Sequence, residues 1–269
     1  MSQVRTETWM KPAVFFDLYG TLIDIRTDEH DPWVYSVLSQ YLSYQAINAA
    51  PEELKSAYFE GIKQNLDQSA ETYPEVDIYN VFHGFMHKYG QRDYPRQVVL
   101  DAILLFRSLT VRQFAVFSGL YDVLDSICKT YETAIISDAQ WSFSEAEISR
   151  LGLDRFFKLR IMSSRYGFKK PDTRMFTLAM EKLRARPGES VYIGDNPSKD
   201  LIGAKKAGMK FILFRSDCSS YDGFQPDRCF HDYSSLEGIL EELFAAQTNV
   251  KASLPSDRLL SAESRTILK

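Results

Sequence analysis

The stretch Ala13-Val14-Phe15-Phe16-Asp17-Leu18-Tyr19-Gly20-Thr21-Leu22 is the most informative feature of this chain. Its four apolar residues, 13–16, do not alternate with polar ones, which predicts a β-strand covered on both faces. Asp17 ends the apolar run and Gly20 breaks the pattern, so a loop follows the strand at once. In an open parallel sheet, ligands bind at the carboxyl ends of the strands. The segment therefore predicts a buried strand that delivers a nucleophilic carboxylate, Asp17, to a ligand site.

Two later segments also place polar side chains where a ligand can reach them. The apolar strand predicted over 133–138 ends in a hydroxyl and a carboxylate, Ser137 and Asp138, which can form hydrogen bonds at the end of the strand. In the segment Tyr166-Gly167-Phe168-Lys169-Lys170-Pro171-Asp172, the proline favours an extended conformation for the residue before it. Lys170 is therefore predicted to project from a loop, with a helix following over 172–183.

A fourth segment, Ser190-Val191-Tyr192-Ile193-Gly194-Asp195-Asn196-Pro197-Ser198-Lys199-Asp200, carries two carboxylates five positions apart. Asp195 ends a predicted strand and Asp200 begins a predicted helix. Both carboxylates can then face one cation, and carboxylate oxygens suit a hard divalent metal ion.

Together, the four segments resemble the four sequence motifs of the haloacid dehalogenase superfamily of hydrolases, over about residues 12–246. The order, the spacing and the strand context agree. The residues that match the motifs are the nucleophile Asp17, the hydroxyl of Ser137, the lysine Lys170 and the acidic pair Asp195 and Asp200. The resemblance implies an α/β fold, with a doubly wound, Rossmann-like parallel-sheet core and an inserted α-helical cap domain.

The domain organisation follows from where the motifs lie. Residues 12–26 and 117–246 are predicted to form the catalytic core, and residues 27–116 the cap. Within the cap, helices are predicted over 32–47, 51–69, 77–89 and 95–107, separated by Pro, Asn, Gly or polar turns. After the last predicted core helix, 235–244, the composition of 247–269 predicts a flexible tail.

The resemblance implies a Mg²⁺-dependent phosphatase of a small phosphorylated metabolite. Asp17 would attack phosphorus to form an aspartyl-phosphate, and a cation and a lysine would hold the two anions together. The implied Mg²⁺ ligands are Asp17, the backbone carbonyl of Tyr19, Asp195 and Asp200. The implied catalytic residues are Asp17, Tyr19, Ser137 and Lys170, and the phosphate-binding residues are Gly20, Thr21, Ser137, Asp138 and Lys170.

Tyr19 departs from the phosphatase pattern, which has a second aspartate there as general acid and base. Absence of that group costs on the order of 10²–10⁴ in rate. The haloacid dehalogenases proper also carry tyrosine at this position, and a halide needs no proton. A dehalogenase-like carbon–halogen hydrolase acting on a 2-haloacid is therefore one alternative, although Asp195 and Asp200 would repel its substrate's carboxylate. A catalytically weak regulatory protein that binds phosphate and Mg²⁺ is the other.

Composition excludes several other function classes. The chain has 269 residues, a formal charge of −4 and 25% charged residues, so it shows no basic footprint for nucleic acid. No apolar run is long enough to predict a membrane span or a signal peptide. Cys128, Cys218 and Cys229 are too widely spaced to suggest a disulfide framework. They favour inert thiols and a cytoplasmic protein, and the oligomeric state is left open.

Overall fold

A computed structural model of the chain describes residues 11–252, apart from the side chains of 247–252. At its centre lies a six-stranded parallel sheet with strand order β5-β4-β1-β6-β7-β8. The strands are β1 Ala13–Phe16, β4 Glu132–Ser137, β5 Leu159–Met162, β6 Ser190–Gly194, β7 Lys210–Phe214 and β8 Arg228–Phe230. β1 lies between β4 and β6, which explains its apolar sequence. The predicted α/β fold is confirmed.

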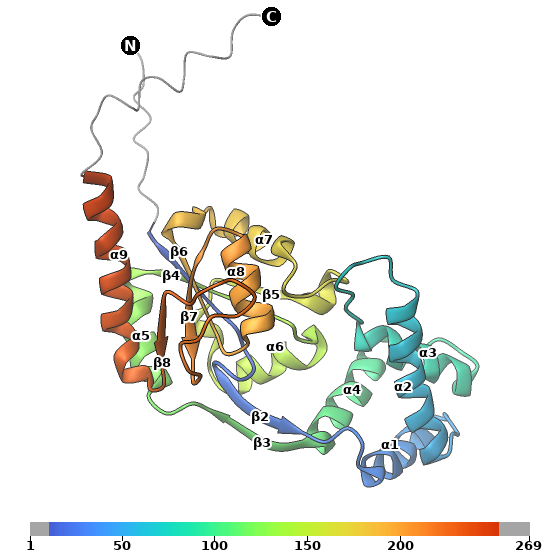
Figure 1. Ribbon diagram of the computed structural model, residues 1–269. Helices are drawn as coiled ribbons and strands as arrows, with labels where there is room; N and C mark the ends of the chain where they lie inside the picture. The colour runs from blue at the N-terminus through green and yellow to red at the C-terminus, as the bar shows by residue number, and fades with distance from the viewer. Residues whose placement is uncertain (1–10, 253–269) are drawn as a thin grey trace, which may run out of the picture.

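Helices cover both faces of this sheet (Figure 1). Side chains alternate along β1, so Val14 and Phe16 join one buried cluster while Ala13 and Phe15 join another. The first cluster includes residues of α5 (Leu120–Thr130), α6 (Trp141–Arg150) and α9 (Leu236–Ala252). The second includes residues of α7 (Thr173–Leu183) and α8 (Ile202–Lys206). This two-sided covering is the doubly wound arrangement.

A four-helix insert lies beside the sheet and its covering helices (Figure 1). Its helices are α1 Pro32–Tyr44, α2 Pro51–Asp67, α3 Ile78–Gly90 and α4 Arg96–Thr110. Each corresponds to one of the helices predicted from the sequence, and together they pack around their own apolar cluster. The division of the chain into core and cap at the predicted residue boundaries stays a prediction.

An antiparallel ribbon links the insert to the sheet, and the sequence did not predict it. It consists of β2 (Ile23–Thr27) and β3 (Val111–Val116). β3 falls in a segment that was expected to be predominantly helical. Its sequence, Val-Arg-Gln-Phe-Ala-Val, does not alternate strictly between apolar and polar residues, and only its β-branched and aromatic residues favour a strand.

The C-terminal helix is longer than predicted. Residues 247–269 were expected to form a flexible tail, but the helical backbone of α9 continues to Ala252. Ala245, Ala246 and Gln247 are good helix formers, and no Gly or Pro interrupts the sequence before Pro255. The flexibility of 247–269 stays a prediction, and residues 253–269 lie outside the described residues.

The expectation of free thiols is wrong for two of the three cysteines. Cys218 and Cys229 form a disulfide, with their Cα atoms 5.7 Å apart, while Cys128 is free. The loop after β7 returns to form β8, and this brings two cysteines together that no spacing rule had paired. The cytoplasmic location rested partly on these thiols and stays a prediction. Between residues 11 and 252, no helix is long and apolar enough to cross a bilayer.

Candidate active site

The predicted site residues meet at the carboxyl edge of the sheet. Asp17 follows β1, Ser137 ends β4 and Asp195 follows β6, and β1 pairs with both β4 and β6. Asp200 lies in a short helical turn, Pro197–Leu201. The Asn196 side chain starts this turn by accepting hydrogen bonds from the backbone N–H groups of the second and third residues after it. Neighbouring strands and one capped turn thus bring together residues far apart in the sequence.

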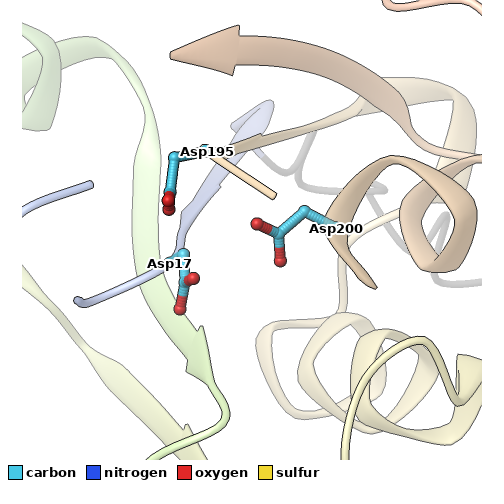
Figure 2. A group of neighbouring side chains, drawn as sticks. All are labelled: Asp17, Asp195 and Asp200. Atoms are coloured by element: carbon cyan, nitrogen blue, oxygen red, sulfur yellow. The ribbon is translucent and has the colours of Figure 1, made fainter. Parts of the chain in front are cut away.

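Three carboxylates cluster at this edge, of which Asp17 and Asp200 are buried and Asp195 is half-buried. One oxygen from each of Asp17, Asp195 and Asp200 lies within 4.8 Å of the others, and Figure 2 shows the Asp200 side chain directed toward the other two. Burial raises the pKa of Asp200 to about 7, against the opposing charge of Lys170, and the charge of Asp17 adds to the rise. Burial and the charge of Asp17 also raise the pKa of Asp195. Such shifts are expected where like charges share a desolvated site.

Lys170 is the one cation buried against this cluster among the described residues. Its Nζ lies 2.6 Å from Asp200 Oδ1 and 3.0 Å from Asp17 Oδ1, and it donates a 2.9 Å hydrogen bond to the hydroxyl of Tyr192. Burial alone would lower the pKa of Lys170, but the charges of Asp17 and Asp200 raise it above its usual value. Lys170 is therefore a fixed positive charge.

The loop after β1 is shaped around Asp195. Gly20 has φ +82°, and a Cβ on it would lie 2.6 Å from a carboxylate oxygen of Asp195. The Thr21 hydroxyl donates a 3.0 Å hydrogen bond to Asp195 Oδ1, and the Tyr233 hydroxyl donates one of 2.6 Å to the carbonyl of Thr21. Glycine is required at position 20 because the backbone passes so close to this carboxylate.

Ser137 and Asp138 lie at the end of β4. Ser137 is buried. Asp138 Oδ1 accepts a 2.8 Å hydrogen bond from the backbone N–H of Lys170, and Oδ2 lies 3.2 Å from Lys199 Nζ. These contacts hold the loop that carries Lys170. The phosphate contact predicted for Asp138 is not tested by these contacts and stays a prediction. The roles predicted for Ser137 and the other site residues also stay predictions.

Tyr19 is fixed by a buried ion pair. Its hydroxyl donates a 2.5 Å hydrogen bond to Glu147 Oε2, while Arg107 Nε donates one of 2.6 Å to Glu147 Oε1. The Arg107 guanidinium lies 5.5 Å from the centre of the Tyr19 ring. Burial and the charge of Glu147 raise the pKa of the Tyr19 phenol well above its usual value. The phenol therefore stays protonated, with its proton engaged by Glu147.

A cleft of 370 Å³ lies beside these residues. Its walls come from the first loop and ribbon, the insert, and the loops after β4 and β5. The lining residues are Tyr19, Ile25, Thr27, Glu29, Glu75, Arg107, Asp138, Ala139, Gln140, Phe143, Lys169 and Lys199. A volume in this range fits a small-molecule ligand.

Sequence reasoning missed Glu75, Arg107, Glu147 and Tyr192. A signal existed for Arg107, because it stands four residues after Ile103 on the apolar face of its helix, where a charge must find a partner. Glu75 lies in a loop, and no periodicity marked it.

A family model of the haloacid dehalogenase-like hydrolases matches residues 14–214, more than half of the chain. The chain is a haloacid dehalogenase-like hydrolase. This hydrolase is 25% identical to the glyceraldehyde 3-phosphate phosphatase of Pyrococcus furiosus, over 76% of this chain and 80% of that one. It is 33% identical to the enzyme of the same name from Methanothermobacter thermautotrophicus, but there the match covers 44% of this chain and only 52% of the relative.

The fold of this hydrolase is also found among solved structures. The 2-haloacid dehalogenase of Pseudomonas syringae pv. Tomato DC3000 superposes with a TM-score of 0.64, at 24% identity, over 87% of this chain and 99% of that one. At that identity the likeness supports the shared fold, and the choice of reaction depends on the residues of the site.

Proposed function

We propose that this hydrolase is a Mg²⁺-dependent phosphatase of a small phosphorylated metabolite. The observation that carries the proposal is the cluster of Asp17, Asp195 and Asp200 around the single ammonium group of Lys170. Three carboxylates and one ammonium leave an excess of negative charge, and a phosphate would add to it. A divalent cation resolves this imbalance, whereas the site is poorly suited to a small anion alone.

The donor set fits Mg²⁺. The three carboxylates supply oxygen ligands from one side of a compact site, and the backbone carbonyl of Tyr19 is the fourth proposed ligand. Gly20 leaves room for Asp195 to approach the first loop. When bound, the ion would neutralise charge on the phosphoryl oxygens and on the attacking carboxylate.

The residues of this chain would then carry out a two-step displacement. The Asp17 carboxylate attacks phosphorus, the bond to the leaving oxygen breaks, and an aspartyl-phosphate forms. Lys170 holds Asp17 in position through its 3.0 Å contact. Thr21, Ser137 and the backbone N–H groups around Gly20 would bind phosphoryl oxygens. Water then cleaves the aspartyl-phosphate and restores Asp17.

The helical insert α1–α4 would act as the cap that selects the substrate. It contributes Glu29, Glu75 and Arg107 to the cleft. The two relatives named above are phosphatases of glyceraldehyde 3-phosphate, a small phosphorylated metabolite, and the volume of the cleft suits a substrate of that size. We place the protein in the cytoplasm, where such metabolites occur.

Tyr19 favours a second candidate reaction, the hydrolysis of a carbon–halogen bond. Because its phenol is engaged by Glu147, it offers no acid to an alkoxide leaving group, and a halide would need none. A 2-haloacid dehalogenase would use Asp17 to attack carbon and would not depend on Mg²⁺. A protein that binds Mg²⁺ and phosphate without turnover is the remaining alternative.

One panel separates the three functions. Purified protein is assayed with glyceraldehyde 3-phosphate, glycerol 3-phosphate, p-nitrophenyl phosphate and 2-chloropropionate, with Mg²⁺ and with chelator. We expect phosphate release that needs Mg²⁺ and is lost in Asp17→Asn. Halide release in the presence of chelator would establish the dehalogenase instead. Binding of phosphate and Mg²⁺ without release of either product would establish the regulatory protein.

A further inference from the structure

The active site lacks an obvious proton donor at the position where this chain carries Tyr19. An alkyl phosphate needs a proton on its leaving oxygen, and the water that later attacks must lose one. The Tyr19 hydroxyl donates its proton to Glu147, which also accepts a hydrogen bond from the Arg107 guanidinium. A different acid must serve the cleft if the enzyme is to hydrolyse alkyl esters efficiently.

Three carboxyl groups line the cleft: Glu29, Glu75 and Asp138. Asp138 is engaged by the Lys170 backbone N–H and by the ammonium group of Lys199. Its two carboxylate oxygens are therefore already engaged, one by the loop that carries Lys170 and one by Lys199.

Glu29 is held on the side of the insert. One of its carboxylate oxygens accepts a 2.8 Å hydrogen bond from the hydroxyl of Tyr58, a residue buried in the core of the insert. Its position therefore follows the packing of the insert helices.

Glu75 is fastened directly to that loop. Its backbone N–H donates a 2.9 Å hydrogen bond to the carbonyl of Gly167, and the N–H of Lys169 donates one of 3.0 Å to the carbonyl of Tyr73. These two bonds join segment 73–75 to segment 167–169 as a short antiparallel pair. The backbone of Glu75 is thus tied to the segment that delivers Lys170 to Asp17.

The side chain of Glu75 is also fixed. Oε2 accepts a 2.7 Å hydrogen bond from the Ser163 hydroxyl, and Oε1 accepts one of 3.0 Å from the N–H of Val76 and a longer one, 3.4 Å, from the Gln140 side-chain amide. Among the described residues, no Lys, Arg or His lies within 4.0 Å of its carboxylate. Glu75 is therefore oriented by neutral groups, without an ion pair.

The surroundings of Glu75 shift its pKa upward from the usual value. Burial raises the pKa of Glu75, and the nearby Asp138 carboxylate adds to the rise. The hydrogen bonds from Ser163 and Val76 and the charge of Lys169 oppose the shift without cancelling it. A carboxyl group with a pKa nearer to neutral can both give and take a proton.

We propose that Glu75 is the general acid and base of this enzyme, supplied by the insert in place of the carboxylate missing at position 19. The inference rests on the proposed phosphatase function. In the first step, Asp17 bonds to phosphorus, the phosphorus–oxygen bond of the ester breaks, and the proton of Glu75 passes to the leaving alkoxide. In the second step, the Glu75 carboxylate takes a proton from a water molecule. The oxygen of that water bonds to phosphorus, and the bond between phosphorus and Asp17 breaks. The products are the alcohol and phosphate, and Glu75 ends the cycle protonated, as it began.

The test is leaving-group dependence in Glu75→Gln, measured by rapid mixing with Mg²⁺. p-Nitrophenolate leaves without a proton, so its first-turnover burst should keep the wild-type rate, followed by a steady state slowed on the order of 10²-fold. With whichever alkyl ester of the panel the wild type hydrolyses fastest, the first turnover itself should fall on the order of 10²-fold or more.

Two matched variants complete the design. Glu71 lies four residues before Glu75 and pairs with Arg174 outside the cleft. Glu71→Gln should therefore behave as the wild type. Glu29→Gln removes the other carboxyl group of the insert that lines the cleft, and it should show no dependence on the leaving group.

The possible results separate the role of Glu75 from the proposed phosphatase function. Equal loss of the first turnover with both esters would show that Glu75 only holds the loop, and unchanged rates would show that it has no role. If the rate loss depends on the leaving group in Glu29→Gln and not in Glu75→Gln, the general acid is Glu29. If the wild type hydrolyses no phosphomonoester with Mg²⁺, the phosphatase function itself is wrong.

Discussion

Lys170 Nζ lies 2.6 Å from Asp200 Oδ1, and the side chains of both residues are almost completely buried. The same ammonium group lies 3.0 Å from Asp17 Oδ1. One lysine thus joins the predicted nucleophile to a predicted metal ligand from a different segment. A buried charge of this kind is tolerated only with its partners in place, which makes the site sensitive to loss of any member.

Replacing Lys170 should damage both stability and turnover. In Lys170→Met, the carboxylates of Asp17 and Asp200 lose their shared cation, and breaking a buried pair costs about 3–5 kcal/mol. Urea unfolding at neutral pH should show this loss, and Mg²⁺ should restore part of it because the ion supplies charge to the same cluster. Unchanged stability without metal would contradict the ion pairing.

The affinity for Mg²⁺ should depend on pH. The pKa of Asp200 in the metal-free fold is about 7, raised above its usual value by burial, so Asp200 carries a proton below that pH. Mg²⁺ must displace this proton, and its dissociation constant should rise by up to about tenfold per unit as pH falls below 7. Calorimetric titrations at pH 6, 7 and 8 measure this slope.

The same pKa shift sets the sign of the effect on folding. A carboxyl group whose pKa is higher in the folded state binds more protons there than in the unfolded chain. Its contribution therefore favours the metal-free fold at low pH and is lost as pH rises toward 7. Asp200→Asn should flatten both this trend and the pH dependence of Mg²⁺ binding. If Asp200→Asn shows the same pH dependence of Mg²⁺ binding as the wild type, the proton that Mg²⁺ displaces lies on another group.

Gly20 should not tolerate a side chain. In Gly20→Ala, the residue would need φ +82°, and its Cβ would lie 2.6 Å from Asp195. We expect a loss of stability of about 1–3 kcal/mol from the backbone strain and a larger loss of Mg²⁺ affinity from the displaced carboxylate. Gly84→Ala, in a helix where a Cβ meets nothing within 4 Å, is the matched control. Wild-type metal binding in Gly20→Ala would contradict the close approach.

The Arg107–Glu147 pair should behave as a unit. Arg107 comes from α4 of the insert and Glu147 from α6 of the core, and both are buried. Glu147→Leu leaves a buried guanidinium without its partner, which costs about 3–5 kcal/mol, whereas the double variant Arg107→Met/Glu147→Leu should recover much of that loss. Thermal unfolding of the single and double variants gives the coupling energy. Additive losses would show that the two charges do not depend on each other.

The sequence predicted the sheet and the residues that meet at its edge because local signals carry that information. An apolar run ending in Asp17, Ser137 or Asp195 marks both a buried strand and its ligand-facing end. Asp200 and Lys170 could be placed because a helix start and an adjacent proline fix their local backbone.

What the sequence did not predict depends on contacts between distant segments. Glu75 becomes a cleft residue only because its loop pairs with 167–169, and Glu147 matters only because Arg107 reaches it from the insert. The Cys218–Cys229 disulfide likewise requires the loop after β7 to turn back. No periodicity or spacing within a single segment encodes such pairings.

Trapping of a covalent intermediate on Asp17 would test the proposed phosphatase mechanism most directly. Wild-type protein is mixed with the best phosphomonoester of the panel and Mg²⁺, quenched in acid within the first turnover, and digested for mass spectrometry. We expect a phosphorylated peptide that contains Asp17 and that is absent with chelator and in Asp17→Asn. Phosphate release without label at Asp17, or turnover retained in Asp17→Asn, would contradict it.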